Sequence, residues 1–390
     1  GRTKAGARAA SSHTGALASS DVAVDALFKK AGIVRCYGRQ ELITLASVFM
    51  YPELKGENIA IITHAGGPAV MLTDALEKGG LNIPNIDSVK SEKLLEKLYP
   101  GSSAENPIDF LATGTAEQLS DIIDACEHDF DEIDAMVVIF GTPGLTKVFD
   151  AYDVIDQKLK SCKKPIYPVL PSINEAKEEI ETFISKNRIF FPEEVLLANA
   201  LSKVYFTNKP SNEEVSLPKV NAAKIREIIQ NADQGYQEPE IVQSLLDAAG
   251  INRVKEIVVQ SKEEAIEKVK DISFPIVMKV VGPIHKSDVG GVVLDIENEG
   301  DMLKEFDRMI KIKDTSAILM QPMLSGTELF AGAKYEDTFG HLVLAGMGGI
   351  FIEVLKDVST VLSPVSKEEA FHMIKSLKSY KLIEGTRGQE

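Results

Sequence analysis

The stretch Asn58-Ile59-Ala60-Ile61-Ile62-Thr63-His64-Ala65-Gly66-Gly67-Pro68 decides the fold that we expect for this chain. Its apolar run, Ile59 to Ile62, is typical of a strand that is buried on both faces. Residues 64–67 form a turn, and Pro68 suits the first turn of a helix that we predict to reach about Lys78. A strand, a glycine-rich turn and a helix in succession indicate one unit of a parallel α/β sheet.

The same alternation continues along the chain. We expect strands at 135–140 and 165–170, and helices at about 118–127, 175–185 and 192–203. Strands that alternate with helices predict a parallel, doubly wound α/β sheet over residues 53–207. Upstream, a loop rich in Ala, Ser and Gly runs to about Ser20, and Asp21 begins a short helix that ends near Lys30.

The second half of the chain has a different pattern. Residues 208–220 combine Pro, Ser and charge without periodicity, so we predict a linker there. Beyond it we expect helices at 240–249 and 262–269. The expected strands are 253–259, 274–281, 292–296, 318–321, 327–334 and 341–344. This pattern favours an α+β domain with antiparallel strands over residues 221–390.

Composition excludes several classes of protein. A chain of 390 residues predicts two or three domains. Its net charge of −15 argues against a general nucleic-acid binder, and no apolar run has the roughly 18 residues of a membrane span. Three scattered cysteines exclude a disulfide framework and indicate a reduced, cytoplasmic protein. The chain begins without Met or an apolar leader, so we expect a fragment without a signal peptide.

A candidate phosphate cradle lies in the second half. Lys279 sits on a predicted strand, and Gly290-Gly291 would let backbone amides approach a ligand closely. A strand lysine followed by a glycine-rich loop is suited to nucleotide phosphates. The alternative is a surface hairpin with a charged tip.

Two histidines lie in loops of small residues. A neutral imidazole can accept a phosphoryl group, so His13 and His285 are candidate nucleophiles. The alternative for each is a solvated loop histidine. We interpret His64 as structural.

The turn at Gly66-Gly67 is a candidate anion site. A strand that ends in glycine and opens a helix leaves free amides at the N-terminus of the helix, which can hold an anion without a lysine. An ordinary strand-to-helix turn is the alternative.

A hinge that could hold a nucleoside follows the predicted strand at 318–321. Gln321-Pro322-Met323 could surround an adenine, with Glu328 near the ribose; a plain β-turn is the alternative. Glu353 follows a second glycine-rich loop, and it is a candidate Mg²⁺ ligand because Mg²⁺ prefers carboxylates together with phosphate oxygens.

Together these motifs resemble the ADP-forming (NDP-forming) acyl-CoA synthetases of the succinyl-CoA synthetase superfamily. The resemblance rests on GARAASSHTGALA at 6–18, ITHAGGPAV at 62–70, ENPIDF at 105–110, VVIFGTPG at 137–144, PIVMKVVGPIHKSDVGGV at 275–292, QPMLSGTELFAGAK at 321–334 and LAGMGGIFIEVLKDV at 344–358. It implies that residues 1–50 end a flavodoxin-like ligase domain carrying a phosphohistidine loop. It further implies a second flavodoxin-like domain at 53–207 and an ATP-grasp domain at 221–390.

The resemblance also implies an activity. Such an acid–thiol ligase converts acyl-CoA, ADP and phosphate reversibly into a carboxylic acid, CoA and ATP, with Mg²⁺ and with phosphoryl groups carried on His13 and His285. Gly66 and Gly67 would support phosphorylated His13, and Lys279 would contact the nucleotide phosphates. The expected partners are nucleotide, phosphate and acyl-CoA, in a homo- or hetero-oligomer without nucleic acid or membrane.

The chain departs from the family pattern at both ends. The CoA-binding domain is missing, and the ATP-grasp domain stops before the segment that supplies Mg²⁺ ligands, so we expect that the chain alone cannot complete the cycle. Two other functions stay open: a sensor of acyl-CoA or nucleotide that regulates a fused acyltransferase, and an unrelated ATP-grasp ligase joined to a binding domain. Neither the acyl group nor the choice between ADP and GDP follows from the residues.

Overall fold

The computed structural model describes residues 2–3, 5–6, 20–142, 146–211, 215–216, 218–283, 286, 288–348 and 357–385. The chain divides into two compact units. Unit 1 comprises Gly1–Asn212, Lys334–Leu342 and Thr360–Ser363, and unit 2 comprises Glu213–Ala333, Val343–Ser359 and Pro364–Glu390.

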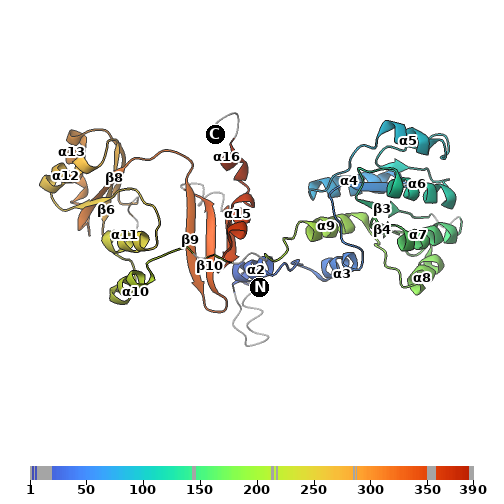
Figure 1. Cartoon of the computed structure of the whole chain (residues 1–390), viewed down its shortest axis with the longest axis horizontal. Helices are drawn as coiled ribbons and strands as arrows, with labels where there is room; N and C mark the ends of the chain where they lie inside the picture. The colour runs from blue at the N-terminus through green and yellow to red at the C-terminus, as the bar shows by residue number, and fades with distance from the viewer. Residues whose placement is uncertain are drawn as a thin grey trace. The chain divides into compact units, whose positions relative to one another are not determined.

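Unit 1 alternates strands with helices, as Figure 1 shows. Its elements in chain order are α2 (Asp21–Lys30), α3 (Arg39–Val48), β1 (Ile59–Thr63), α4 (Gly66–Lys78), α5 (Ser88–Leu95), β2 (Ile108–Asp109), α6 (Ala116–His128), β3 (Ala135–Ile139), α7 (Phe149–Ser161), β4 (Ile166–Val169), α8 (Lys177–Ser185) and α9 (Glu194–Tyr205).

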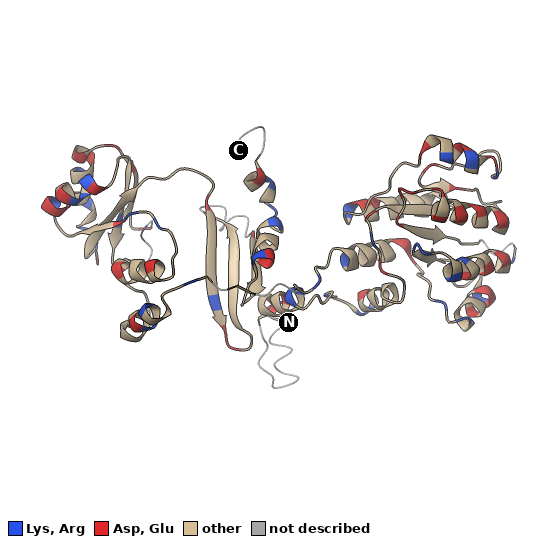
Figure 2. Cartoon of the chain, viewed as in Figure 1, with Lys and Arg blue, Asp and Glu red and all other residues tan. Residues whose placement is uncertain are grey.

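The sheet of unit 1 is parallel, with the strand order β2-β1-β3-β4. Every residue of β1, β3 and β4 is buried, and Figure 2 shows these strands without charged residues, whereas the surrounding helices carry many. A parallel bridge between Val169 and Phe191 adds a rudimentary fifth position at the edge. This is the flavodoxin-like order, and the predicted parallel α/β sheet is confirmed.

Helices cover both faces of this sheet. Side chains alternate along β1: Ile59 and Ile61 join one apolar cluster, while Ala60 and Ile62 join the other. The first cluster packs against α3, α4 and α9. The second packs against α6, α7 and α8, where a capping box formed by Thr115 and Gln118 begins α6.

Unit 2 holds most of the remaining elements. They are α10 (Ala222–Asn231), α11 (Pro239–Ala248), β5 (Ile257–Val259), α12 (Lys262–Lys268), the 3₁₀ helix η1 (Val269–Asp271), β6 (Ile276–Val281), β7 (Val292–Ile296), α13 (Glu299–Met309), β8 (Ala317–Pro322), β9 (Leu329–Glu336), β10 (Gly340–Met347), β11 (Val358–Leu362), α15 (Lys367–Lys375) and α16 (Tyr380–Glu384). The last residues of β9, the first of β10 and the last of β11 belong to unit 1.

A four-stranded antiparallel sheet with the order β5-β8-β6-β7 forms the core of unit 2. One face, which includes Ile276, Met278 and Val280, packs against α12 and α13. On the opposite face, the described residues include a small apolar cluster, in which Val281, Ala317 and Leu319 are buried. A second sheet has the order β11-β10-β9. The predicted α+β domain with antiparallel strands is therefore confirmed.

Several elements differ from the prediction. Strand β5 is shorter than the predicted 253–259 and begins at Ile257, because Arg253 is turned back to Asp247 by two hydrogen bonds of 2.8 and 2.9 Å. Helices α3, α5, α7, α10, α13 and α16 and strands β2 and β11 were not predicted. In α13, for example, only Met302, Phe306 and Met309 are buried in an otherwise charged sequence.

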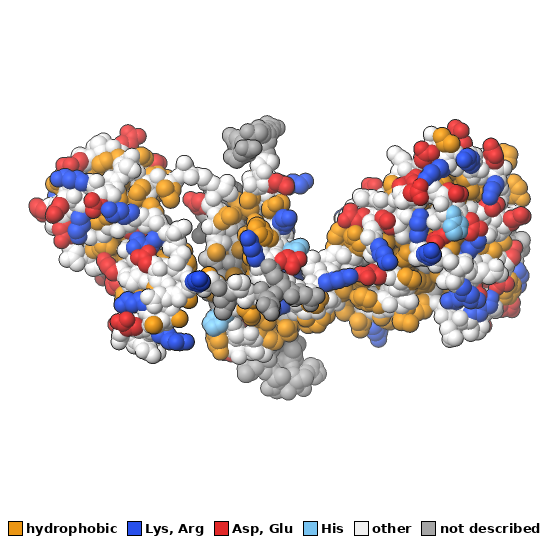
Figure 3. All heavy atoms as spheres, in the orientation of Figure 1, with side chains coloured by type: hydrophobic (Ala, Val, Ile, Leu, Met, Phe, Trp, Pro, Cys, Tyr) orange, Lys and Arg blue, Asp and Glu red, His pale blue; other side chains and the backbone are white. Residues whose placement is uncertain are grey.

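The surface of unit 1 has an apolar patch. Helix α3 and the two residues after it expose Leu42, Ile43, Phe49 and Met50, and Figure 3 shows hydrophobic atoms gathered over this helix. Within the part of the chain that the structure describes, no helix is long and apolar enough to cross a membrane.

Candidate functional site

The N-terminus of α4 forms one half of the candidate site. Gly66 and Gly67 make its first turn, which contains no acidic residue and is capped by no side chain. Both glycines are exposed, and a Cβ on either would meet nothing within 4 Å. The first amides of a helix have no partner inside the helix and carry partial positive charge, so this turn suits an anion.

The turn that leads into α4 is held by side chains. The Thr63 hydroxyl accepts a hydrogen bond from the Ala65 amide (3.0 Å) and donates one to the Ala65 carbonyl (2.9 Å). His64, which we interpreted as structural, lies with Nε2 2.7 Å from the carbonyl oxygen of Gly141. Its ring stacks on Phe140 with the centroids 4.4 Å apart and the planes 6° apart.

Lys279 lies on β6 in unit 2, on the less covered face of the antiparallel sheet. Its register partner on β8 is Leu319, which belongs to the apolar cluster of that face. The Nζ atom donates to Gln321 Oε1 at 3.3 Å. Burial lowers the pKa of Lys279, Glu256 and Glu328 act in the opposite direction, and Lys286 lowers the pKa further.

Glu256 is a residue of this face that sequence reasoning missed. The pairing of Ile257 with Met320 places Glu256, the residue just before β5, opposite Gln321. The Glu256 carboxylate accepts a hydrogen bond of 3.2 Å from Gln243 on α11. Period-two alternation with Val258 would have assigned Glu256 to one face of a strand, but only the pairing with β8 brings it near Lys279.

Gly290 and Gly291, which we predicted to bind phosphate, form the turn before β7. Gly290 has a φ of +67°, in the left-handed region, and its carbonyl accepts from Arg308 at 3.0 Å. The Gly291 amide donates to the Lys286 carbonyl at 2.8 Å, so this amide is committed to the turn. A Cβ on Gly291 would lie 2.4 Å from Val280 Cγ2, so the glycine is needed for packing.

The predicted hinge, Gln321 to Met323, begins beside Lys279. Gln321 and Pro322 end β8, and Gln321 is the one that contacts Lys279. The Met323 amide donates to the Pro275 carbonyl at 2.8 Å, so only the side chain or carbonyl of Met323 is left to contact a nucleoside. Glu328 is exposed, and its carbonyl accepts from the Gly348 amide at 2.6 Å.

Three predicted site residues, His13, His285 and Glu353, lie outside the described residues. Among the residues that are described, no three His, Cys, Asp or Glu side chains gather in a way that could hold a metal ion.

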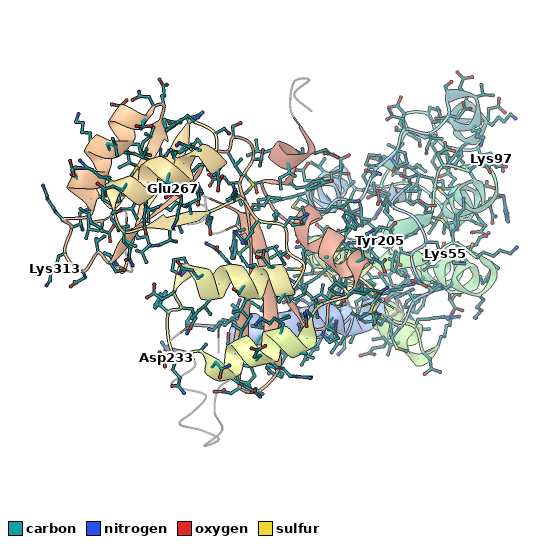
Figure 4. The ribbon with its side chains drawn as sticks, turned by 60° about the vertical axis from the view of Figure 1, so that its left-hand side comes forward. Lys55, Lys97, Tyr205, Asp233, Glu267 and Lys313 are labelled. Carbon is teal, nitrogen blue, oxygen red and sulfur yellow. The ribbon has the colours of Figure 1, made fainter. Side chains whose placement is uncertain are left out.

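A hollow of about 810 Å³ lies elsewhere in unit 1. Its walls come from residues 48–57 and 201–210, together with Gly32, Val34 and Tyr167. Figure 4 labels two of its lining residues, Lys55 and Tyr205. None of the predicted site residues that the structure describes lines this hollow.

Two family models match the chain. The model of the ATP-grasp domain matches residues 227–390. The model of the succinyl-CoA ligase-like flavodoxin domain matches residues 1–49.

Individual relatives extend these matches. The 4-hydroxybutyrate–CoA ligase (ADP-forming) of Nitrosopumilus maritimus is 32% identical over all of this chain and 58% of its own length. The β subunit of acetate–CoA ligase (ADP-forming) I of Pyrococcus furiosus is 36% identical over 43% of this chain and 78% of that subunit. A solved structure of acetyl-coenzyme A synthetase 1 from Ca. Korarchaeum cryptofilum is 33% identical over 43% of this chain and 76% of that chain, with a TM-score of 0.39.

These sequence matches define the class of protein. The chain combines a flavodoxin-like parallel sheet with an ATP-grasp domain, and it belongs to the ADP-forming acyl-CoA ligases. It spans 58% of the length of two of its curated relatives, the 4-hydroxybutyrate–CoA ligase and an acetate–CoA ligase I.

Proposed function

We propose that this chain carries the phosphoryl-transfer and nucleotide-binding part of an ADP-forming acyl-CoA ligase. The reaction would convert acyl-CoA, ADP and phosphate reversibly into a carboxylic acid, CoA and ATP. The observation that supports it most is the half-buried Lys279, which lies beside Gln321 on the less covered face of the antiparallel sheet. A buried ammonium needs negative charge nearby, and nucleotide phosphates would supply it.

The proposed reaction begins at the thioester and ends at the nucleotide. Phosphate oxygen replaces sulfur at the acyl carbon, which releases CoA and forms an acyl phosphate. An imidazole nitrogen of His13 then attacks phosphorus, and the carboxylate leaves. The phosphoryl group passes through His285 to the terminal phosphate oxygen of ADP, which forms ATP and restores both imidazoles.

The described residues have distinct proposed roles. The amides of Gly66 and Gly67 would hold the phosphoryl group on His13, and Lys279 would contact the nucleotide phosphates. Gly290 and Gly291 would shape the turn beside those phosphates, and Gln321 to Met323 with Glu328 would surround the nucleoside. Mg²⁺ would arrive on the nucleotide and neutralise its charge.

We extend the proposal to assembly and location. Relatives in Pyrococcus furiosus are described as α and β subunits, so we propose that this chain works in a homo- or hetero-oligomer that supplies CoA binding. We retain the domain boundaries 1–50, 53–207 and 221–390, with the linker at 208–220. We place the activity in the cytoplasm, where the free thiols of Cys36, Cys126 and Cys162 would stay reduced.

Phosphorylation by Mg·ATP tests the function directly. The chain is incubated with Mg·ATP, and phosphohistidine is mapped by mass spectrometry under alkaline conditions. We expect phosphate on His13 that disappears in His285→Ala as well as in His13→Ala. Bound ATP without phosphate on either histidine would contradict the ligase proposal and favour a nucleotide-sensing module.

A further inference from the structure

His64 lies where the sheet of unit 1 is best placed to bind a ligand. In an open parallel sheet, ligands bind outside the carboxyl ends of the strands, at the point where the strand order reverses. In the order β2-β1-β3-β4 that point lies between β1 and β3. His64 follows the last residue of β1, and its hydrogen-bond partner Gly141 lies two residues beyond the end of β3.

The hydrogen bond to Gly141 determines the tautomer of the neutral His64 ring. A carbonyl oxygen can only accept, so His64 Nε2 must carry the proton that it shares with Gly141. The other ring nitrogen, Nδ1, is then an acceptor in the neutral ring. Nδ1 is enclosed, and the described protein atoms offer it no hydrogen-bond partner.

Packing alone does not account for a histidine here. The ring stacks on Phe140, whose centroid is 4.4 Å away, and lies near Phe110, whose centroid is 6.1 Å away. A phenylalanine would make the same ring contacts and leave no enclosed nitrogen without a partner, which is costly. Imidazole adds one capacity that phenylalanine lacks, which is to donate to Gly141 from a flat, stacked ring.

The acceptor is itself fixed in place. The Thr142 amide donates to Ser172 Oγ at 2.8 Å, and that hydroxyl donates back to the Thr142 carbonyl at 2.9 Å. Ser172 follows β4, so this pair ties the end of β3 to the end of β4. The hydrogen bond of His64 therefore joins the turn after β1 to a segment that is itself tied to the end of β4.

The His64 ring contacts residues on the face of the sheet opposite α4. Phe110 and Phe140 belong to the apolar cluster that packs against α6 and α7, whereas Ala69, Leu72 and Leu76 of α4 belong to the other cluster. His64 therefore acts on the turn through the backbone. Gly66 is only two residues further along the chain, so the position of the turn sets the direction of the first amides of α4.

We propose that His64 is a positioning residue of the phosphoryl site at Gly66 and Gly67, and that it acts by joining the carboxyl end of β1 to that of β3 through Gly141. The proposal rests on the proposed function, because it takes the first turn of α4 as the site of the phosphoryl group. Displacements of about 1 Å at a reacting group can cost up to about a hundredfold in rate. A firmly held turn is therefore valuable there.

Titration of the whole chain with inorganic phosphate, followed by the amide NMR signals of Gly66 and Gly67, tests the proposal. We expect both signals to shift in the unaltered chain. His64→Phe keeps the stacked ring but loses the donor, and it should weaken phosphate binding by roughly three- to tenfold, the range that one lost hydrogen bond covers. His64→Gln places a donor near the position of Nε2, and it should restore most of the affinity.

The matched control is His128→Phe. His128 is exposed on the last turn of α6 in the same unit, so this change should leave the phosphate titration unaltered. Equal phosphate affinity in His64→Phe and the unaltered chain would overturn the role of His64 while leaving the anion site intact. Signals of Gly66 and Gly67 that do not respond in the unaltered chain would overturn the anion site, and the role of His64 with it.

A second measurement does not depend on the variants folding. Nitrogen-15 NMR of the His64 ring in the unaltered chain reports which nitrogen carries the proton. The proposal requires a proton on Nε2 and none on Nδ1 in the neutral ring. A proton on Nδ1 alone would exclude the hydrogen bond to Gly141 and overturn the proposal.

Discussion

The Nζ atom of Lys279 lies 3.3 Å from Oε1 of Gln321, across two neighbouring strands of the antiparallel sheet. One neutral acceptor does not compensate for burying an ammonium group, and burial accordingly lowers the pKa of this lysine. The two residues thus form a partly satisfied polar pair on the face opposite α12 and α13. A nucleotide that binds there would complete the contacts of Lys279.

Lys279→Met should impair phosphoryl transfer. Methionine keeps the length and the apolar contacts of the side chain but removes the charge. We expect the rate of phosphorylation by Mg·ATP to fall by roughly a hundredfold, as when one stabilising donor is removed from a transition state. Lys304→Met, at an exposed position on α13, is the control and should phosphorylate at the normal rate. An unchanged rate in Lys279→Met would exclude this lysine from the reaction.

The pH dependence of the reactivity of Lys279 should reveal the effect of Glu256 on the pKa of this lysine. The reaction of an amine-directed reagent with Lys279 is measured by mass spectrometry as a function of pH. Because burial lowers the pKa of Lys279, its midpoint should lie below the ordinary lysine value of about 10.4. Glu256 raises the pKa, so Glu256→Gln should move the midpoint to still lower pH.

The control for this measurement is Gln243→Ala. It removes the hydrogen bond to the Glu256 carboxylate but retains the charge that acts on Lys279. Its midpoint should therefore stay much closer to that of the unaltered chain. A midpoint that is unchanged in Glu256→Gln would mean that Glu256 does not act on Lys279.

Sequence patterns predicted the parts of the fold that are encoded locally. Strands β1 and β3 were predicted because continuous apolar runs bounded by turns are typical of a parallel sheet. Helix α13 was missed although its buried residues Met302, Phe306 and Met309 recur at the spacing of an amphipathic helix. Helix α10 was also missed, although Ile225, Ile228 and Ile229 recur at helical spacing; none of its residues is buried.

The candidate site was predictable only where its chemistry lies within one segment. Lys279 was proposed from a strand followed by a glycine-rich loop, and Gly66 from a strand that opens a helix. Glu256 approaches Lys279 through the pairing of β5 with β8, and His64 finds its acceptor 77 residues away. Contacts of this kind depend on tertiary pairing, which no local pattern shows.

Two glycine substitutions should differ in their effect on stability. In Gly291→Ala the new methyl would lie 2.4 Å from Val280 Cγ2 and 2.9 Å from the Lys286 carbonyl, so we expect a loss of roughly 1–3 kcal/mol from overpacking. Gly66→Ala meets open space and gains helix propensity, so stability should be unchanged or slightly higher. Chemical denaturation measures both, and a destabilised Gly66→Ala would contradict the open turn.

Asp357 should make part of the stability of unit 2 depend on acid pH. Burial alone would raise the pKa of Asp357, but hydrogen bonds from the Ser379 hydroxyl (2.5 Å) and from the amides of Ser379 (2.8 Å) and Lys378 (3.0 Å) outweigh it and lower the pKa. A carboxyl with a lowered folded-state pKa stabilises the fold above its unfolded pKa of about 3.9, and that contribution is lost as the pH falls through the folded value.

Asp357→Asn should therefore cost about 1–3 kcal/mol at pH 7 and much less near pH 2. Denaturation at both pH values measures the difference, with exposed Asp233→Asn (Figure 4) as a control that should change neither. An equal loss at both pH values would show that the charge of Asp357 is not what stabilises this turn.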